Sequence, residues 1–326
     1  MTPAKRATPA GSSARLAAQA KVNLFLRVLG REPDGYHQLE TLFQRISLAD
    51  DVAIAVDVRG RALDCRGADV GPMERNLAWR AATEFADATG WPNGFAIELT
   101  KEIPVGGGLG GGSADAGAVL RILNALAPSP LSDEVLFGIA RSLGADVPFL
   151  ASSAPTAVGL LRGDVIVACP PPHRRDVILL VPPFSVSSRD AFGWYADAHS
   201  REPRKASRLA TPASGIALAT VEAAIAAREQ GATVNSTDYA FSWREVASLA
   251  GNDLQPVVVE RHPEVGRAVA LLRAAGAPLA QMTGSGSAVF GIFPNRPMGG
   301  VVALPPGFTM LHAETLTRVA DVQLVS

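Results

Sequence analysis

Several stretches within the first hundred residues are apolar or alternate apolar and polar positions with the two-residue period of β-strands. Strand-like stretches run through residues 15–29, 41–48 and 51–58, and the turn-rich GREPDG at residues 30–35 separates the first two. Residues 95–100, FAIELT, predict a further strand. The N-terminal part is therefore expected to be built on a sheet.

Apolar residues then recur at helical spacing. Residues 76–89 show this period and end at Gly90, the residue type that helices favour just past their C-terminus. Helices are also predicted at residues 113–126 and from Ser132 to about residue 143. Strands followed by helices in this order indicate the α+β class.

The proline cluster at residues 170–172 is the best candidate boundary between two halves. We expect an N-terminal domain over residues 16–170 and a C-terminal domain over residues 171–326. In the second domain the pattern predicts a strand at 176–181, helices near 221–228, 241–249 and 264–275, and a Gly/Ser loop running into a strand within 281–293. The charged, proline-containing residues 196–214 are expected to form a surface loop.

Composition narrows the classes of partner. The 326 residues carry a formal net charge of −1, which argues against binding to duplex nucleic acid or to an anionic membrane surface. No apolar run approaches the roughly 18 residues that span a bilayer. Two cysteines are too few for a disulfide framework or a four-ligand zinc site. We expect a cytoplasmic protein that is a monomer or a weak homodimer.

The N-terminus has a composition of its own. Residues 1–31 contain no acidic side chain and carry four arginines among Ala, Ser, Thr and Pro. A targeting peptide also shows this composition. Because strand-like sequence begins near residue 16, the composition favours a disordered extension over residues 1–15.

The most informative segment is Pro104-Val-Gly-Gly-Gly-Leu-Gly-Gly-Gly-Ser-Ala-Asp115, between a predicted strand and a predicted helix. It holds six of the 31 glycines. Glycine lets backbone N–H groups turn toward an anion, and the following helix N-terminus adds positive potential. Close strand-to-helix packing is the alternative, but each glycine costs about 0.5–1 kcal/mol of extra backbone entropy relative to alanine. Polyphosphate binding is the favoured interpretation.

Three known glycine-rich motifs do not match this sequence. A dinucleotide fingerprint matches at Gly106, Gly108 and Gly111, but its acidic residue would be Asp133, at the start of a helix. A Walker A loop requires lysine where Ser113 stands. The protein-kinase loop lacks the HRD and DFG sequences that should follow it.

Instead, three motifs in order resemble the galactokinase, homoserine, mevalonate and phosphomevalonate kinase (GHMP) superfamily. They are Ala20-Lys-Val-Asn-Leu-Phe-Leu26, the glycine segment, and Met282-Thr-Gly-Ser-Gly-Ser-Ala-Val-Phe290. Within it, GREPDGYH at residues 30–37, GADVPF at 144–149 and Asn252-Asp-Leu254 are similar to the 4-diphosphocytidyl-2-C-methyl-D-erythritol kinase family. The resemblance covers about residues 16–293. It implies an N-terminal ATP-binding domain, a C-terminal α/β sandwich domain and an active site in the cleft between them.

The resemblance also implies residue roles. Asp146 would be the carboxylate that orients or accepts the proton of the attacking hydroxyl, and Lys21 would pair with it. By position alone Asp146 is more typical of a solvated loop or capping residue, and the resemblance reverses this preference. Asn23, two residues after Lys21 on the same strand face, would bind the substrate. Tyr36 would stack on cytosine, His37 would meet the polar edge of the base, and Phe192 would supply a second stacking ring.

For ATP and Mg²⁺ the resemblance implies a larger set. The residues placed around the nucleotide are Asn76, Lys101, Pro104, Gly106, Gly107, Gly108, Leu109, Gly110, Gly111, Gly112, Ser113, Thr283, Gly284, Ser285 and Gly286, and Ser113 is the candidate Mg²⁺ ligand. The family often shows Ser-Ser-Asn after the glycines, whereas this chain has Ser113-Ala-Asp115. Asp115 could bind Mg²⁺ directly.

The expected activity is phosphorylation of the 2-hydroxyl of the cytidyl diphosphate substrate in non-mevalonate isoprenoid synthesis. One rival is another kinase of the superfamily, acting on mevalonate, homoserine or a sugar. Tyr36 and His37 argue against it, because such kinases need no cytosine site. The other rival is a catalytically silent nucleotide-binding module, against which both Lys21 and Asp146 argue.

Overall fold

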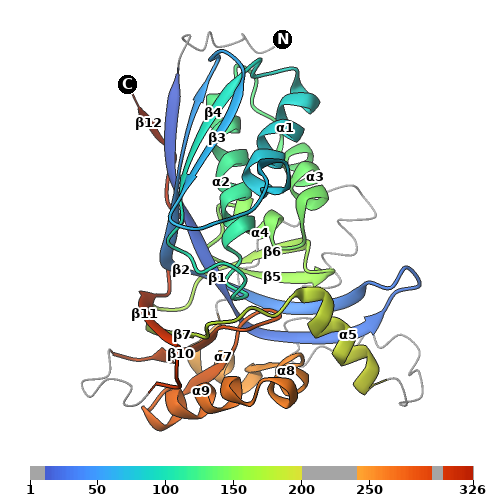
Figure 1. Cartoon of the computed structure of the whole chain (residues 1–326), viewed down its shortest axis with the longest axis vertical. Helices are drawn as coiled ribbons and strands as arrows, with labels where there is room; N and C mark the ends of the chain where they lie inside the picture. Colours follow the sequence, from blue (N-terminus) through green and yellow to red (C-terminus); the bar gives the residue numbers. More distant parts are fainter. Residues whose placement is uncertain (1–11, 200–240, 296–303, 326) are drawn as a thin grey trace.

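The computed structural model describes residues 12–199, 241–295 and 304–325 (Figure 1). The first sheet is built on a long antiparallel pair, β1 (Ser13–Arg31) and β2 (His37–Val56). β12 (Gln323–Val325) and the two-residue β8 (Gly251–Asn252) pair with β1. One half of β2 pairs with β4 (Phe95–Thr100), which pairs with β3 (Arg61–Arg66), and the other half pairs with β5 (Thr156–Leu161), which pairs with β6 (Val165–Cys169).

Helices cover one face of this sheet: α1 (Leu77–Thr89), α2 (Gly111–Leu126), α3 (Asp133–Leu143) and the short α4 (Val147–Ala151), with the single 3₁₀ turn η1 (Met73–Arg75) before them (Figure 1). The predicted helices at residues 76–89, 113–126 and 132–143 are confirmed within two residues. Asn76 begins α1 by accepting a hydrogen bond from the Ala78 N–H, and Gly90 ends it with a left-handed φ of 71°.

The second sheet is antiparallel, in the order β11 (Thr309–Glu314), β7 (Asp176–Val181), β10 (Val289–Phe293) and β9 (Leu279–Met282). Alternate residues of β7 face two cores. Val177 and Leu179 pack in the core of the first sheet, whereas Ile178 and Leu180 pack in the core beneath α8 (Gln255–Arg261) and α9 (Pro263–Ala274). This double burial explains why residues 177–181 of the predicted strand are all apolar. Among the described residues, α5 (Ser188–Ala198) and α7 (Trp243–Leu249) are two further helices.

Three sequence predictions need correction. Residues 41–48 and 51–56 belong to one strand, because Asp50 does not break β2, and residues 57 and 58 lie beyond its end. The buried Asp50 carboxylate accepts hydrogen bonds from the Glu102 and Ile103 N–H groups at 2.6 and 2.8 Å. Residues 196–198 form the end of α5 instead of a loop, whereas residues 200–214 and the predicted helix at 221–228 lie outside the described residues. Of the expected N-terminal extension, residues 13–15 pair with β2 and β12, and residues 1–11 lie outside.

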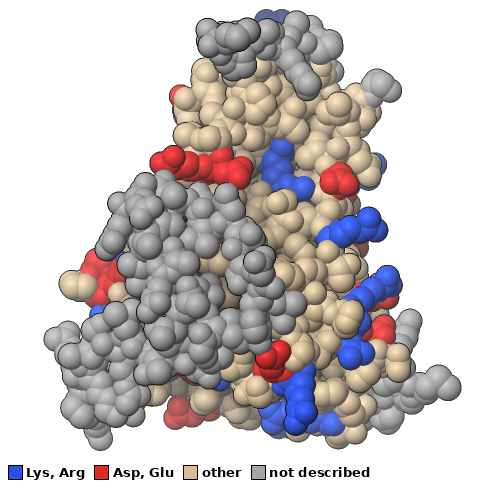
Figure 2. Space-filling view, turned by 180° about the vertical axis from the view of Figure 1, so that it is seen from behind, with Lys and Arg blue, Asp and Glu red and all other residues tan. Residues whose placement is uncertain are grey.

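The predicted boundary at residue 170 falls between β6, the last strand of the first sheet before the proline cluster, and β7 of the second sheet. β8 and β12 come from the C-terminal part and pair with β1. Acidic and basic side chains are scattered among neutral ones on the described surface in Figure 2. In the three described ranges, the helices are all too short or too polar to cross a membrane.

Candidate active site

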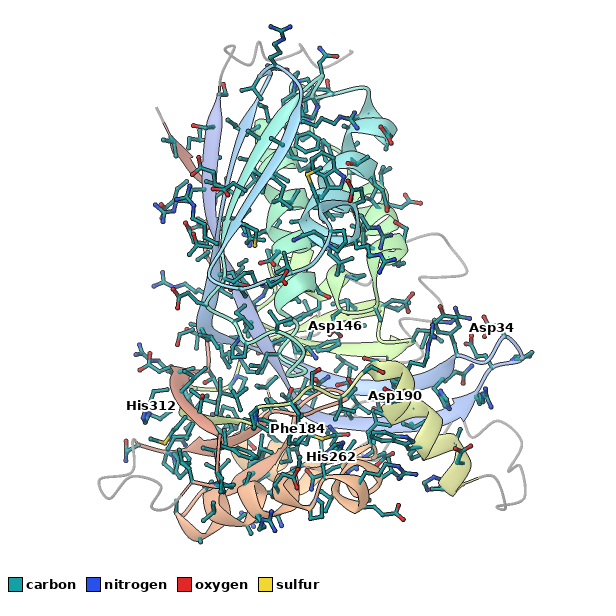
Figure 3. All side chains as sticks on the ribbon, in the orientation of Figure 1. Asp34, Asp146, Phe184, Asp190, His262 and His312 are labelled. Carbon is teal, nitrogen blue, oxygen red and sulfur yellow. The ribbon has the colours of Figure 1, made fainter. Side chains whose placement is uncertain are left out.

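A cavity of about 1360 Å³ opens between the two parts of the chain. Its N-terminal wall consists of β1, the glycine segment and the start of α4. Its C-terminal wall consists of residues 186–189, Phe192 of α5, and residues 284–286. Figure 3 shows Asp146 above this region, Asp190 of α5 below it and Asp34 at the tip of the β1–β2 hairpin. The predicted site residues line this cavity, with Thr283 as an exception.

Lys21 and Asp146 form an ion pair on the cavity wall. Lys21 Nζ lies 3.1 Å from Asp146 Oδ2; the lysine side chain is only 3% exposed, whereas that of Asp146 is 31% exposed. Asp146 begins α4, but its carboxylate makes no capping hydrogen bond. One side of this carboxylate therefore faces a buried cation while the other remains accessible from the cavity.

Asn23 fixes the ammonium from the other side. Lys21 Nζ donates to Asn23 Oδ1 at 2.7 Å, and Asn23 Nδ2 donates to Thr41 Oγ1 at 2.8 Å. Thr283 Oγ1 also donates to Asn23 Oδ1, at 3.3 Å. The Asn23 oxygen thus accepts from both Lys21 and Thr283, and one N–H of its amide group donates to Thr41, so Asn23 holds Lys21 in one orientation.

The glycine segment adopts a conformation that requires glycine at alternate positions. Gly106, Gly108 and Gly110 have φ values of 76°, 78° and 74°, in the left-handed region that L-residues disfavour. The segment then enters α2 at Gly111. A Cβ on Gly110 would approach Lys21 Cε to 3.0 Å, which places the loop directly against the ion pair.

Residues 283–288 hold the glycine segment from the C-terminal side. The Ala288 N–H donates to the Gly107 carbonyl at 3.0 Å, and a Cβ on Gly108 would press on the Thr283 carbonyl oxygen. On the other side, the Lys21 N–H donates to the Leu109 carbonyl at 3.0 Å. Thr283 is fully buried and supports this loop, so its position differs from that of Gly284, Ser285 and Gly286, which line the cavity.

Lys101 lines the cavity, but its ammonium lies between two buried carboxylates. Nζ donates to Asp115 Oδ2 at 2.6 Å and to Asp50 Oδ2. Burial lowers the pKa of Lys101, but the Asp115 and Asp50 carboxylates outweigh it, and the net effect raises that pKa. Burial also raises the pKa of Asp115, to about 7, against the opposing effect of Lys101. The triad links β2, the end of β4 and α2 beneath the glycine segment.

The geometry of this triad affects which side chains can bind Mg²⁺. One oxygen of Asp115 binds Lys101, and the other is buried without a hydrogen-bond partner in the structure. No group of three or more His, Cys, Asp or Glu suited to a metal ion occurs among residues 12–199, 241–295 and 304–325. Asp115 Oδ2 is therefore held in the triad while Oδ1 has no partner, and the half-buried Ser113 hydroxyl lies on the same cavity wall at the start of α2.

Aromatic side chains gather at the hairpin end of the cavity. Tyr36 is 60% exposed, and the Arg162 guanidinium lies over its ring at 4.2 Å. The His37 ring stacks on Phe192 with centroids 5.1 Å apart. Burial, with a smaller contribution from Arg31, lowers the pKa of His37. His37 is therefore neutral at pH 7, with one ring nitrogen able to donate and the other able to accept.

Sequence reasoning missed several side chains that shape the site. Arg162 holds the hairpin tip through Glu32 Oε2, 2.9 Å from Nε, and through Asp34. Asn252 Nδ2 donates to the carbonyls of Met282 and Gly284 at 3.0 and 2.8 Å, and so fixes the segment of residues 283–288. Motif similarity marked Asn252 without a role, and nothing in the local pattern marked Arg162.

Comparison with known proteins identifies the family. The model of the GHMP kinases N terminal domain matches residues 76–161, and that of the GHMP kinases C terminal domain matches residues 238–297. A 4-diphosphocytidyl-2-C-methyl-D-erythritol kinase from Geobacter sp. (strain M21) is 39% identical over 282 residues, which cover 86% of this chain and 89% of that protein. The chain belongs to the 4-diphosphocytidyl-2-C-methyl-D-erythritol kinase family.

Other members of this kinase family give the same result. The Desulfotalea psychrophila protein of that name is 37% identical and covers 85% of this chain and 84% of its own length. A crystal structure of 4-(cytidine 5'-diphospho)-2C-methyl-D-erythritol kinase superposes with a TM-score of 0.65 at 31% identity, covering 92% of this chain and 98% of that one. A crystal structure of L. major mevalonate kinase in complex with R-mevalonate has a TM-score of 0.63 at 15% identity, which shows the shared fold alone. The expected two-domain GHMP kinase fold is confirmed.

Proposed function

We propose that the chain transfers the γ-phosphoryl group of ATP to the 2-hydroxyl of 4-diphosphocytidyl-2-C-methyl-D-erythritol, in the non-mevalonate isoprenoid pathway. The observation that carries this proposal is the Lys21–Asp146 pair, which lies directly against a glycine segment suited to phosphates. We further propose that residues 16–170 form the ATP-binding domain and residues 171–326 the second domain, in a cytoplasmic monomer or weak homodimer.

The glycine segment would bind the triphosphate of ATP. Its left-handed glycines would allow backbone N–H groups to turn toward the phosphates, and the N-terminus of α2 would add partial positive charge. Asn76, Pro104 and the backbone near Lys101 line the same wall and would accommodate the nucleoside. The Lys101 side chain would support this wall through the triad, because its ammonium is already bound by two carboxylates.

Phosphoryl transfer would proceed between this loop and Asp146. The substrate 2-hydroxyl would approach the accessible face of the carboxylate, which orients it and accepts its proton as the new O–P bond forms. The bond from the γ-phosphorus to the bridging oxygen breaks, and ADP leaves. Lys21 would balance the carboxylate charge and stabilise negative charge on the transferring group.

Mg²⁺ would be held mainly by the ATP phosphates, with the Ser113 hydroxyl as the protein ligand. Sites of this kind use one or two protein donors and keep several waters, which fits the available groups. When bound, the ion neutralises charge on the β- and γ-phosphates.

The aromatic end of the cavity would bind cytosine. Tyr36 offers an exposed ring for stacking, and such contacts contribute about 1–3 kcal/mol per base. Neutral His37 can donate to or accept from the base edge, and Phe192 lies beside it on α5. Asn23 would act beside Lys21, where it orients the ammonium toward the reacting hydroxyl.

A parallel assay tests this function. ADP formation is measured with the cytidyl diphosphate substrate, mevalonate, homoserine and galactose under identical conditions. We expect turnover with the cytidyl substrate only. Turnover of another alcohol while the cytidyl substrate is silent would overturn the specificity, and silence with all four would favour a nucleotide-binding module without catalysis.

A further inference from the structure

Arg45 is a charged side chain buried deep in the first sheet. It is 2% exposed, and within the described ranges no carboxylate lies within ion-pair distance of its guanidinium. Burial, with a smaller effect from Arg121, lowers the pKa of Arg45 to about 9, so the group is still charged at neutral pH. An unpaired buried cation is costly unless hydrogen bonds replace its water. Its partners should therefore show what it is for.

Its partners are backbone carbonyls at the end of α4. Nη2 donates to the carbonyls of Phe149, Leu150 and Ser152 at 2.8, 3.0 and 3.0 Å, and Nε donates to that of Ala154 at 3.0 Å. The last carbonyls of a helix have no partner within the helix and carry partial negative charge. Arg45 thus caps the C-terminal end of α4 with a full positive charge.

The other end of α4 begins at Asp146. The helix has only five residues, so its own hydrogen bonds cannot hold it in place, and the Leu150 N–H donates directly back to the Asp146 carbonyl at 3.2 Å. Any movement of the C-terminal end of this single turn therefore moves the Asp146 backbone as well.

One pair of opposed residues on β1 and β2 contacts both ends of α4. Lys21 on β1 and Arg45 on β2 are directly opposed in register. Opposed residues in an antiparallel pair project from the same face of the sheet. Lys21 reaches the carboxylate at the start of α4, and Arg45 reaches the carbonyls at its end.

Helix α2 packs closely against α4. A Cβ on Gly117 would lie 2.5 Å from the Leu150 carbonyl carbon and oxygen, so the two backbones are in close contact. The Arg45 guanidinium also lies over the Phe149 ring at 5.0 Å. α4 is thereby held by α2 on one side and by β2 on another.

We propose that Arg45 is a positioning residue that anchors α4 and so sets the position of the Asp146 carboxylate relative to Lys21 and the glycine segment. This inference rests on the proposed role of Asp146. Arg45 contacts neither substrate and acts through the α4 backbone. Misplacement of a catalytic group by about 1 Å can cost on the order of 100-fold in rate.

The test compares Arg45→Met with a matched control. Arg121→Met also removes a partly buried arginine that donates to a carbonyl, Ala320 at 2.6 Å, but this arginine makes no hydrogen bond to α4. We expect Arg45→Met to lower kcat by about 10- to 100-fold, with KM for ATP and for the cytidyl substrate within about twofold, and Arg121→Met to leave kcat within about twofold. A kcat for Arg45→Met equal to that of the control would overturn the proposal.

Two further variants keep the test decisive. Arg45→Lys keeps the charge but cannot reach all four carbonyls, so it should lose kcat even if Arg45→Met does not fold. In the Asp146→Asn background, Arg45→Lys should cause no further loss of kcat, because both changes act on one carboxylate. Additive losses would show that Arg45 does not act through Asp146. A normal kcat for Asp146→Asn alone would instead refute the proposed role of Asp146.

Discussion

Gly108 is the glycine whose replacement the structure predicts to be most damaging to ATP use. In Gly108→Ala the new Cβ would press on the Thr283 carbonyl oxygen and lie 3.1 Å from that of Gly286. The φ of 78° alone costs an L-residue about 1–2 kcal/mol. Neither neighbour is a flexible side chain, so the loop must move, and we take about 2 kcal/mol as the minimum total.

That energy corresponds to a loss of about 30-fold or more in kcat/KM for ATP. KM for the cytidyl substrate should change little, because the aromatic end of the cavity is untouched. Steady-state kinetics with each substrate varied in turn checks this. Gly138→Ala on α3 is the control, since its Cβ would meet nothing within 4 Å. A kcat/KM for ATP within threefold of the wild-type value would refute the reasoning.

Three other predictions follow from side chains around the cavity. Tyr36→Ala should raise KM for the cytidyl substrate by about 5- to 150-fold through lost stacking and leave KM for ATP unchanged; an unchanged cytidyl KM would remove Tyr36 from the base site. Since the pKa of His37 is lowered in the folded state, the unfolded state binds more protons just below pH 6.5, and the stability of the protein should rise with pH through that window. His37→Gln should flatten this part of a profile of melting temperature against pH. An unaltered profile would contradict this prediction. Lys101→Met should lower the free energy of unfolding, measured in urea, by about 3–5 kcal/mol, because it leaves the buried Asp50 and Asp115 carboxylates facing each other. A loss below about 1 kcal/mol would exclude the triad of Lys101, Asp50 and Asp115 as a stabilising element.

Local patterns predicted the regular elements well. The 76–89 helix is marked at its C-terminal end by Gly90, and the structure uses this residue as expected. The glycine segment is equally local, because the left-handed conformation is a property of each residue's own backbone. Lys21 and Asp146 are 125 positions apart in the sequence, and their pairing was predicted only through resemblance to a family.

Side chains whose partners are distant in sequence were not predictable. Lys101 follows a predicted strand, but its ammonium is bound by Asp50, 51 positions away, and by Asp115, and no local pattern indicates these partners. Arg45 reaches carbonyls more than 100 positions away, and backbone carbonyls carry no sequence signal at all.

The central claim is that Asp146, paired with Lys21 beside the glycine segment, carries out phosphoryl transfer to the cytidyl substrate. Its most direct test is kcat of Asp146→Asn with saturating ATP and cytidyl substrate. Asparagine keeps the shape but cannot accept the hydroxyl proton, so we predict a loss on the order of 100-fold or more, with both KM values little changed. A kcat near that of the wild-type chain would contradict the account.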